Sequence, residues 1–385
     1  MYNILTLNKI SKEGLAHLDA KNYTVSDACE APDGVLVRSA AMHDMVMPES
    51  LLCIARAGAG VNNIPVDACT EKGIVVFNTP GANANAVKEL ALCGLLLASR
   101  KIVDGINWAR TLETDVAKQV EKGKSQFVGP ELMGKTLGII GLGAIGGPLA
   151  NAAHHIGMDV LGYDPYISVD AAWSLSRTIK KAKTIEEIYE NCDYISIHVP
   201  ATPETKGSLN AQAFSMMKDG VRIINFARGE LVNEADMAAA LESGKIASYV
   251  CDFPTEATLK MKNCVCIPHL GASTYESEEN CANMAVSELS SFLETGNIKN
   301  SVNFPNAELA RTGDTRICII HKNIPDMLRQ IMAVVSEKKI NIENMVNKSR
   351  QAVAYTMLDI DGDASDELVA SIKAIDGIVR VRVIK

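Results

Sequence analysis

Residues 134–164 read GKTLGIIGLGAIGGPLANAAHHIGMDVLGYD, and the order of the patterns in this stretch decides the fold. An apolar run at 137–140 predicts a buried parallel strand, and a helical segment leads from it to a second apolar strand at 160–163. Three glycines in G-x-G-x-x-G spacing follow the first strand: Gly141, Gly143 and Gly146. Such glycines permit a tight turn, let a pyrophosphate approach the backbone and let the helix pack on the strand. We therefore predict a dinucleotide-binding βαβ unit, with the phosphates at a helix N-terminus.

The acid after the second strand indicates which dinucleotide is bound. Asp164 lies 164 − 141 = 23 positions after Gly141, close to the spacing at which a carboxylate binds the adenosine ribose hydroxyls. The same carboxylate would repel a 2′-phosphate, and no Arg or Lys follows it directly, which favours NAD. A merely structural glycine turn is the alternative interpretation. The residues of this motif that we expect to contact the cofactor are Gly141, Gly143, Ala144, Ile145, Gly146 and Asp164.

The overall composition narrows the class of protein. The chain has 385 residues, of which 47% are hydrophobic, enough for two or three domains with real cores. A net charge of −8 without a basic cluster argues against nucleic acid or an anionic membrane as partner. The first residues show no signal-peptide pattern and the apolar run near 91–98 is too short to span a bilayer, so we expect a cytoplasmic protein. Ten cysteines without C-x-x-C or Cys/His spacing predict free thiols and no metal site.

Residues 1–97 are interpreted as a small α/β unit, with strands expected at 4–7, 35–38, 52–56 and 74–77. A long helical pattern at 83–124 leads from it to the nucleotide-binding stretch. Strands then continue to alternate with helices, the later strands being 195–200, 221–226, 248–253 and 265–267. This alternation predicts a doubly wound parallel (Rossmann) sheet for residues 98–275.

The end of the chain follows a different pattern. A long helix is expected at about 275–294, and residues 301–315 are polar with Pro and Gly, which is typical of a linker. Residues 316–385 show the periodicity of strand, helix, strand, strand, helix and strand. This βαββαβ order predicts a ferredoxin-like module.

Two arginines end strands of the first unit. Arg38 and Arg56 each close an apolar run and are followed by small residues. An arginine at the carboxyl end of a parallel strand points into the crevice where α/β sheets bind ligands. The alternative is that each arginine is solvated at the edge of the sheet, but two at matched positions favour anion binding.

A nicotinamide enzyme that acts on an alcohol needs an acid/base at the oxygen, a group that tunes it and a cation for an anionic substrate. His269 is the best placed of the seven histidines, because it follows a short buried strand and precedes a small-residue turn. Glu256 lies in a loop 269 − 256 = 13 residues earlier, where a carboxylate can fix the imidazole tautomer. Arg228 ends another strand and can hold a carboxylate bidentately. The alternatives are a structural histidine, a solvated glutamate and a surface ion pair.

Three separated stretches now match a known family in the same order: NFARGELV (225–232), DFPTE (252–256) and PHLGAST (268–274). Together they resemble the D-isomer-specific 2-hydroxy-acid dehydrogenases, and the resemblance covers essentially the whole chain. It implies that Arg228 binds the substrate carboxylate and keto group, that His269 is the acid/base and that Glu256 is its partner. It also implies a flavodoxin-like substrate domain made of residues 1–97 and completed by 276–300. The further residues that the resemblance places at the cofactor are His198, Pro200, Ala227, Asp252, His269 and Gly271.

Three motifs of the first unit indicate which branch of this family the chain resembles: VRS (37–39), RAG (56–58) and NTP (78–80). They resemble the motifs of the branch whose enzymes oxidise D-3-phosphoglycerate with NAD to 3-phosphohydroxypyruvate, which is the first step of L-serine biosynthesis. The substrate-binding residues that this implies are Arg38, Arg56, Gly58, Arg228 and His269. Two alternatives stay open: a reductase of another small 2-keto acid such as glyoxylate or hydroxypyruvate, and a non-enzymatic NADH-sensing regulator.

The C-terminal module, 316–385, resembles an ACT regulatory domain. His321, Asn323 and Asn341 match the positions at which such modules bind serine across a dimer interface, although polar loop residues without a ligand are the alternative. Asp326 stands where the serine-binding pattern has glycine, and the segment after Trp108 is longer than in many relatives. We expect a homo-oligomer, a dimer or a tetramer, that forms at least a dimer through the dehydrogenase domain. The four-stranded modules offer further contacts, because such sheets commonly pair edge to edge.

Overall fold

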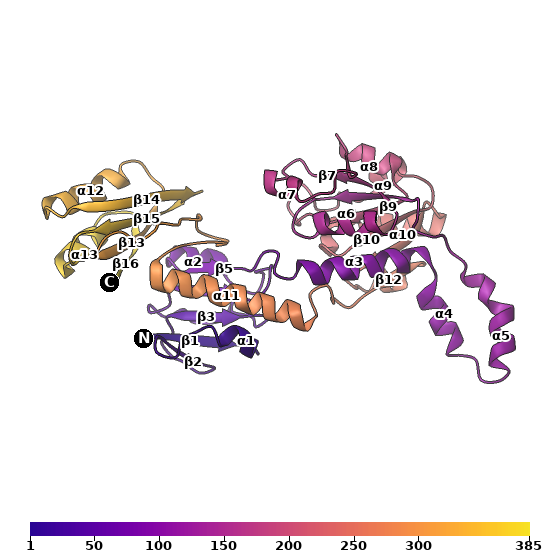
Figure 1. The fold of residues 1–385 in the computed structure, drawn as a ribbon, viewed down its shortest axis with the longest axis horizontal. Helices are drawn as coiled ribbons and strands as arrows, with labels where there is room; N and C mark the ends of the chain where they lie inside the picture. Colours follow the sequence, from indigo (N-terminus) through magenta and orange to yellow (C-terminus); the bar gives the residue numbers. More distant parts are fainter. The chain divides into compact units, whose positions relative to one another are not determined.

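The computed structural model describes all residues, 1–385, as two compact units (Figure 1). One unit contains residues 1–83 and 278–385, and the other contains 84–277. The first boundary lies after Asn83 instead of after residue 97, because helix α3 (Ala84–Ser99) packs on the sheet of the second unit. No helix combines the length and the apolar character needed to cross a membrane.

The second unit is built on a seven-stranded parallel sheet in the order β12-β11-β10-β9-β6-β7-β8. The strands are β6 (Thr136–Ile140), β7 (Asp159–Tyr163), β8 (Lys180–Lys181), β9 (Tyr194–Ile197), β10 (Val221–Asn225), β11 (Ile246–Cys251) and β12 (Cys264–Cys266). The helices between them are α6 (Gly146–His155), α7 (Val169–Trp173), α8 (Ile185–Asn191), α9 (Ala211–Met216) and α10 (Glu234–Ser243). The order reverses between β6 and β9, and ligands of such sheets bind at the carboxyl ends of the strands beside this point. The predicted doubly wound sheet is confirmed.

The single long helix predicted at 83–124 is wrong. The structure has α3, α4 (Ile102–Ala109), α5 (Val116–Gly123) and a 3₁₀ turn η1 (Lys124–Phe127). The turn between α4 and α5 contains two β-branched threonines and Asp115, whose φ of 44° is left-handed and incompatible with a continuing helix. The Trp108 ring packs on Phe127, 5.3 Å between centroids, and holds this helical arm together.

The first unit begins with a five-stranded parallel sheet in the order β2-β1-β3-β4-β5. Its elements are β1 (Tyr2–Leu7), α1 (Lys12–Leu15), β2 (Tyr23–Ser26), β3 (Gly34–Val37), β4 (Cys53–Arg56), α2 (Val66–Glu71) and β5 (Val75–Phe77). The four predicted strands are present, and β2 is an additional edge strand with two exposed residues. Helix α11 (Tyr275–Thr295) packs its apolar side on this sheet through Val286, Leu289 and Phe292.

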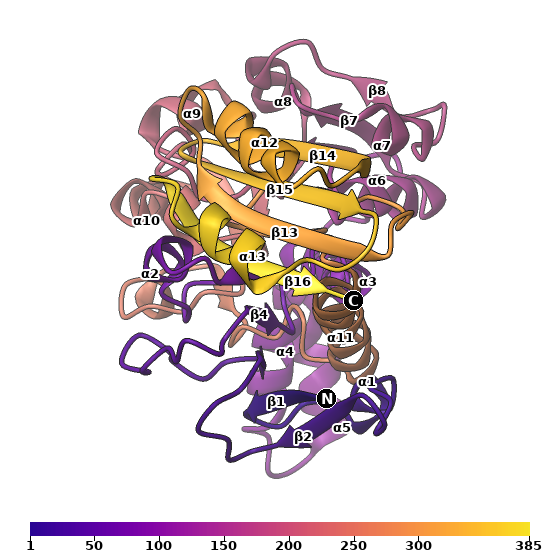
Figure 2. The same cartoon turned by 90° about the vertical axis from the view of Figure 1, so that its left-hand side faces the viewer.

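The predicted βαββαβ order at the C-terminus is confirmed. The elements are β13 (Thr315–Lys322), α12 (Met327–Glu337), β14 (Ile342–Arg350), β15 (Val353–Ile360), α13 (Asp366–Lys373) and β16 (Ile378–Ile384). They form an antiparallel sheet, β14-β15-β13-β16, with both helices on one face (Figure 2). The other face joins the core of the first sheet, where Tyr355 and Met357 lie in one cluster with Phe292.

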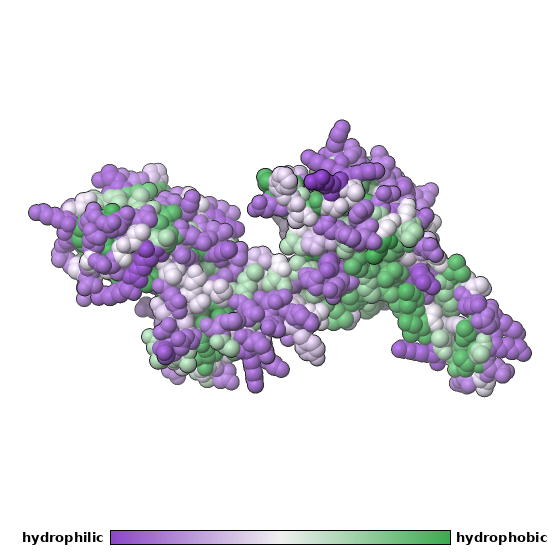
Figure 3. All heavy atoms as spheres, in the orientation of Figure 1, coloured by the Kyte–Doolittle hydropathy of each residue, from purple (hydrophilic) through white to green (hydrophobic).

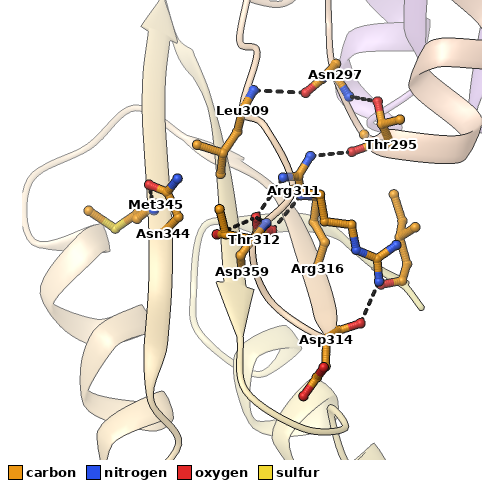
Figure 4. A network of polar contacts seen from close by, with 12 residues as sticks. Thr295, Asn297, Leu309, Arg311, Thr312, Asp314, Arg316, Asn344, Met345 and Asp359 are labelled. Atoms are coloured by element: carbon orange, nitrogen blue, oxygen red, sulfur yellow. Dashed lines mark hydrogen bonds and ion pairs between the residues drawn. The ribbon is translucent and has the colours of Figure 1, made fainter.

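The segment 301–315, predicted as a linker, connects the two parts of this unit, and part of it packs into the unit. Phe304 is fully buried, and the Asn303 side chain binds the backbone of Ile74 and Val76. Beyond it, Arg316 and Asp359 form a fully buried bidentate ion pair, with contacts of 2.6 and 2.8 Å (Figure 4). Arg316 also donates to the carbonyl of Thr295 at the end of α11, so it anchors the C-terminal module to that helix.

Candidate active site

The glycine loop of the second unit has the shape that a pyrophosphate requires. Gly141 has a φ of +92°, and a Cβ there would come within 2.7 Å of the His198 carbonyl oxygen. A Cβ at Gly146 would collide with the Gly141 carbonyl, so this glycine allows α6 to begin close to the strand. Gly143 faces open space, with no atom within 4 Å of where a Cβ would stand, and Ala144 beside it is exposed. The backbone is thus open where a phosphate would approach the start of α6.

Asp164 follows β7 and lies beside this loop. Its carboxylate accepts hydrogen bonds from the backbone N–H groups of Leu142 and Tyr166, each at 2.9 Å. These bonds fix the acid against the glycine loop, at the carboxyl edge of the sheet. That placement suits a carboxylate that accepts hydrogen bonds from ribose hydroxyls.

His198 directly follows β9, and its carbonyl lies beside Gly141 of the glycine loop. Its Nε2 lies 2.8 Å from the Ser196 hydroxyl, whereas its Nδ1 is buried without a partner. Burial lowers the pKa of His198 to about 4, so the ring is neutral at physiological pH. A neutral ring with an unsatisfied buried nitrogen fits a position that a bound cofactor completes, and the exposed Pro200 follows it.

Arg228 lies in the loop after β10, and a buried asparagine shapes that loop. Asn225 accepts from the backbone N–H groups of Ala227 and Arg228 and donates to the Arg228 carbonyl at 2.8 Å. Arg228 itself is exposed, with its guanidinium donating to the Ala227 carbonyl. Sequence reasoning quoted Asn225 in a motif without giving it a role. A polar residue at the buried end of a strand was the signal that could have shown its role.

His269 lies in the loop after β12, and Asp252 supports that loop. The buried Asp252 carboxylate accepts from the N–H groups of Leu270 and Gly271, both at 2.7 Å, and its own carbonyl accepts from the N–H of His269. Burial raises the pKa of Asp252 despite these bonds. The exposed His269 ring packs edge-on against Phe253, 5.2 Å between centroids. Asp252, predicted to contact the cofactor, is thus the support of the histidine loop.

Glu256 is exposed in the loop after β11, and no hydrogen bond joins it to His269. The loop around it is nevertheless ordered, because Thr255 and Thr258 bond to each other and Thr255 donates to Glu234 at 2.9 Å. Glu234, at the start of α10, was not identified from the sequence. The predicted partnership of Glu256 with His269 therefore stays a prediction.

The structure brings the two predicted arginines of the first unit together. Val37 pairs with Arg56 across β3 and β4, so Arg38 and Arg56 leave neighbouring strands at the same edge. Arg38 forms an ion pair with Glu278 at 2.8 Å, and Arg56 Nε donates to the Arg38 carbonyl. Gly58, with a φ of +151°, leaves the space that the Arg56 guanidinium fills, since a Cβ there would collide with it. This edge presents two cations and a glycine turn.

The three predicted effector residues do not meet within one chain. His321 is buried, and both of its ring nitrogens have partners, the Lys322 carbonyl at 2.8 Å and Thr356 at 2.9 Å. Asn323 lies near the start of β15 and Asn341 near its end, because they bond to Gln351 and Asp361 respectively. Any ligand that contacts both asparagines must therefore lie between two copies of the module.

Asp326 occupies the position where the serine-binding pattern has glycine. Its φ of +71° explains that preference, since glycine adopts this conformation most readily and aspartate tolerates it. The carboxylate is held by Arg329, which lowers the pKa of Asp326. The extra negative charge at this position is therefore paired with a cation on the same helix.

Comparisons with known proteins agree with this geometry. The model of the D-isomer specific 2-hydroxyacid dehydrogenase NAD binding domain matches residues 92–271. A D-3-phosphoglycerate dehydrogenase of Haemophilus influenzae is 32% identical over 340 residues, 84% of this chain and 79% of that protein. One of Methanocaldococcus jannaschii is 34% identical over 316 residues, 80% of this chain but only 58% of that longer protein.

Solved structures show the same fold. The NAD⁺-bound 3-phosphoglycerate dehydrogenase of Entamoeba histolytica has a TM-score of 0.61 and 28% sequence identity, covering 78% of this chain and 99% of that chain. A glyoxylate reductase of Paecilomyes thermophila has a TM-score of 0.66, 24% identity and coverage of 78% and 98%. At that identity, the second likeness supports the fold alone.

Proposed function

Because the chain belongs to the D-isomer-specific 2-hydroxyacid dehydrogenases, we propose that it oxidises D-3-phosphoglycerate to 3-phosphohydroxypyruvate with NAD, the first step of L-serine biosynthesis. The observation that carries the choice of substrate is the pair of arginines at the carboxyl ends of β3 and β4. Two guanidinium groups and a glycine turn suit a phosphate, which accepts several charge-assisted hydrogen bonds. A small unphosphorylated keto acid does not need a second cationic group of this kind.

Different residues of the second unit then have different roles in the reaction. NAD, when bound at the glycine loop, supplies the acceptor for the hydride that leaves C2 of the substrate. His269 takes the proton of the C2 hydroxyl, and its exposed ring on a loop fixed by Asp252 is suited to that exchange. Arg228 binds the substrate carboxylate and stabilises charge on the C2 oxygen from a loop that Asn225 holds.

The test is oxidation of D-3-phosphoglycerate by the full chain with NAD⁺, followed by nicotinamide absorbance. We expect turnover with NAD⁺, little with NADP⁺ because Asp164 repels a 2′-phosphate, and none with L-lactate. Brisk turnover on glyoxylate without turnover on the phosphorylated acid would instead favour the reductase alternative. Tight NADH binding without turnover on any 2-hydroxy acid would favour a cofactor-sensing regulator.

We also infer that the C-terminal module binds L-serine between two copies, since one copy separates Asn323 from Asn341. Serine can inhibit only as far as its affinity differs between two arrangements of the enzyme. Calorimetry of the full chain should show serine binding that Asn341→Ala removes. Asn344→Ala on β14, the strand that begins directly after Asn341, is the matched control and should bind normally. Unchanged binding by Asn341→Ala would contradict this site.

The homo-oligomer is proposed to form, at least in part, through the arm made of α3, α4 and α5. Apolar atoms gather over α3 and α4 (Figure 3). Large apolar side chains on these helices are 38–48% exposed: Leu96, Ile102, Ile106 and Val116. A run of exposed apolar side chains on adjacent helices is typical of a protein–protein contact.

A further inference from the structure

Three cysteines that lie apart in the sequence converge at the edge of the seven-stranded sheet. Cys251 ends β11 and pairs in register with Cys266 on β12, so their side chains leave the same face of the sheet. Cys264 lies two residues before Cys266 and shares that face. The alternation of a parallel strand pair therefore gathers three thiols from two strands, which no Cys spacing in the sequence indicates.

The distances between the sulfur atoms match those of metal ligands. Cys264 Sγ lies 3.6 Å and Cys251 Sγ lies 3.9 Å from Cys266 Sγ, and all three sulfurs lie within 4.8 Å of one another. A tetrahedral zinc ion with bonds of about 2.3 Å to sulfur separates its ligands by roughly 3.8 Å. Cys251 lies in the hydrophobic core and Cys264 and Cys266 pack against it, so the sulfur separations, and not burial, carry the assignment.

The three cysteines have no fourth protein ligand. Cys251 is buried, whereas Cys264 and Cys266 are partly exposed, and no fourth His, Cys or carboxylate joins the group. We propose that Cys251, Cys264 and Cys266 form a binding site for a thiophilic closed-shell cation, Zn²⁺, with solvent as the fourth ligand. The thiols release their protons to solvent as the thiolates bind the metal.

The site adjoins the catalytic loops without belonging to them. Cys251 directly precedes Asp252, and Cys266 lies three residues before His269. A metal that joins the ends of β11 and β12 would therefore restrict the two loops that carry the support and the acid/base of the reaction. Zinc binding at this site would therefore change turnover independently of the substrate.

The test uses the full chain, reduced and freed of metal with a chelator, and titrated with Co²⁺. We expect one equivalent to produce thiolate-to-cobalt charge-transfer bands and the intense visible bands of tetrahedral cobalt, which Zn²⁺ then removes. Cys264→Ser and Cys266→Ser should each weaken binding by at least about a hundredfold, since even groups that only orient a ligand are worth about 10–100-fold. The exposed Cys93→Ser is the matched control and should bind as the unmodified chain does.

NADH binding by each variant shows that it is folded, and the unmodified chain provides a test that needs no variant. X-ray absorption of the zinc-loaded protein should find three sulfur neighbours at about 2.3 Å. Fewer than three sulfurs, or equal cobalt binding by the Cys264→Ser variant, would overturn the site. A metal-free chain that binds no cobalt and yields a disulfide within the cluster on mild oxidation would also overturn it, and would point to a redox role.

Discussion

At the scale of single residues, His269 combines backbone strain with exposure. Its φ of 55° is left-handed, a conformation that costs a non-glycine residue about 1–3 kcal/mol and persists only where the surroundings impose it. Here the hydrogen bonds from the N–H groups of Leu270 and Gly271 to the Asp252 carboxylate impose this conformation. Such strain is concentrated at functional sites, and it supports the role that the sequence motif suggested.

Replacement of His269 by asparagine tests that role with little disturbance, because asparagine tolerates a positive φ. We expect kcat to fall by about a hundredfold or more, since general acid–base catalysis is worth about 10²–10⁴. NADH affinity, measured by fluorescence, should stay normal. The exposed His17→Asn is the control. Near-normal turnover would show that another group exchanges the proton.

Arg38 and Arg56 are expected to act on substrate binding. Arg56→Met or Arg38→Met should mainly raise KM, because an anion contact exists in both the ground state and the transition state. Glu278→Gln frees Arg38 from its ion pair and should not raise KM. The exposed Arg177→Met is the control for loss of positive charge. An effect confined to kcat would mean that these arginines do not bind the substrate anion.

Glu288 on α11 makes stability depend on pH. Burial raises its pKa to about 8 from an ordinary value of 4.5, and one of its oxygens has no partner. The folded chain therefore holds more protons than the unfolded chain between these values, so this group makes stability fall as pH rises from 4.5 to 8. Glu288→Gln should increase the free energy of unfolding in urea by at least about 1 kcal/mol at pH 8 and by less at pH 5, since one pKa unit is worth about 1.4 kcal/mol.

The exposed Glu279→Gln on the same helix is the control for this stability measurement and should show no such trend. A gain for Glu288→Gln that is the same at both pH values would show that the Glu288 carboxyl is not protonated in the folded chain.

At the scale of elements, alternation and glycine spacing predicted most of the fold. Strand β6 is almost entirely apolar, and β10 is buried apart from the half-buried Arg222, because helices cover both faces of a parallel sheet. β2 was not predicted, because an edge strand with exposed residues lacks a continuous apolar run. The bond of Glu234 to Thr255 could not be predicted either, because only folding brings these two residues together. The bonds of Asn225 are local, and the signal for them was a polar residue at the buried end of a strand.

The helical arm provides an element-scale test of the oligomer. Ile106 on α4 is 47% exposed, so its replacement by glutamate should not damage a core. If the arm is an interface, Ile106→Glu should shift the chain towards a smaller species in sedimentation velocity. Asp104→Lys on the same helix controls for a change in charge. An unchanged distribution of species for Ile106→Glu would move the interface elsewhere.

At the scale of the whole molecule, the C-terminal module is part of the unit that carries Arg38 and Arg56. Tyr355 donates to the Gly296 carbonyl at 2.7 Å, and Arg382 lies 4.3 Å from the centre of the Phe292 ring. β13 and β15 are buried on both faces, and the sequence did not indicate which partner covers the second face. A ligand of the module would therefore act on a unit that also contains the proposed substrate-binding edge.

The central claim is that the enzyme recognises a phosphate. Phosphohydroxypyruvate and hydroxypyruvate differ only by that group, so the ratio of their kcat/KM values with NADH measures its recognition directly. We predict that the phosphorylated substrate is preferred by at least about a hundredfold, because each hydrogen bond to a charged group is worth about 1.5–3 kcal/mol. We further predict that Arg56→Met reduces the preference. Equal kcat/KM values for the two substrates would contradict the account.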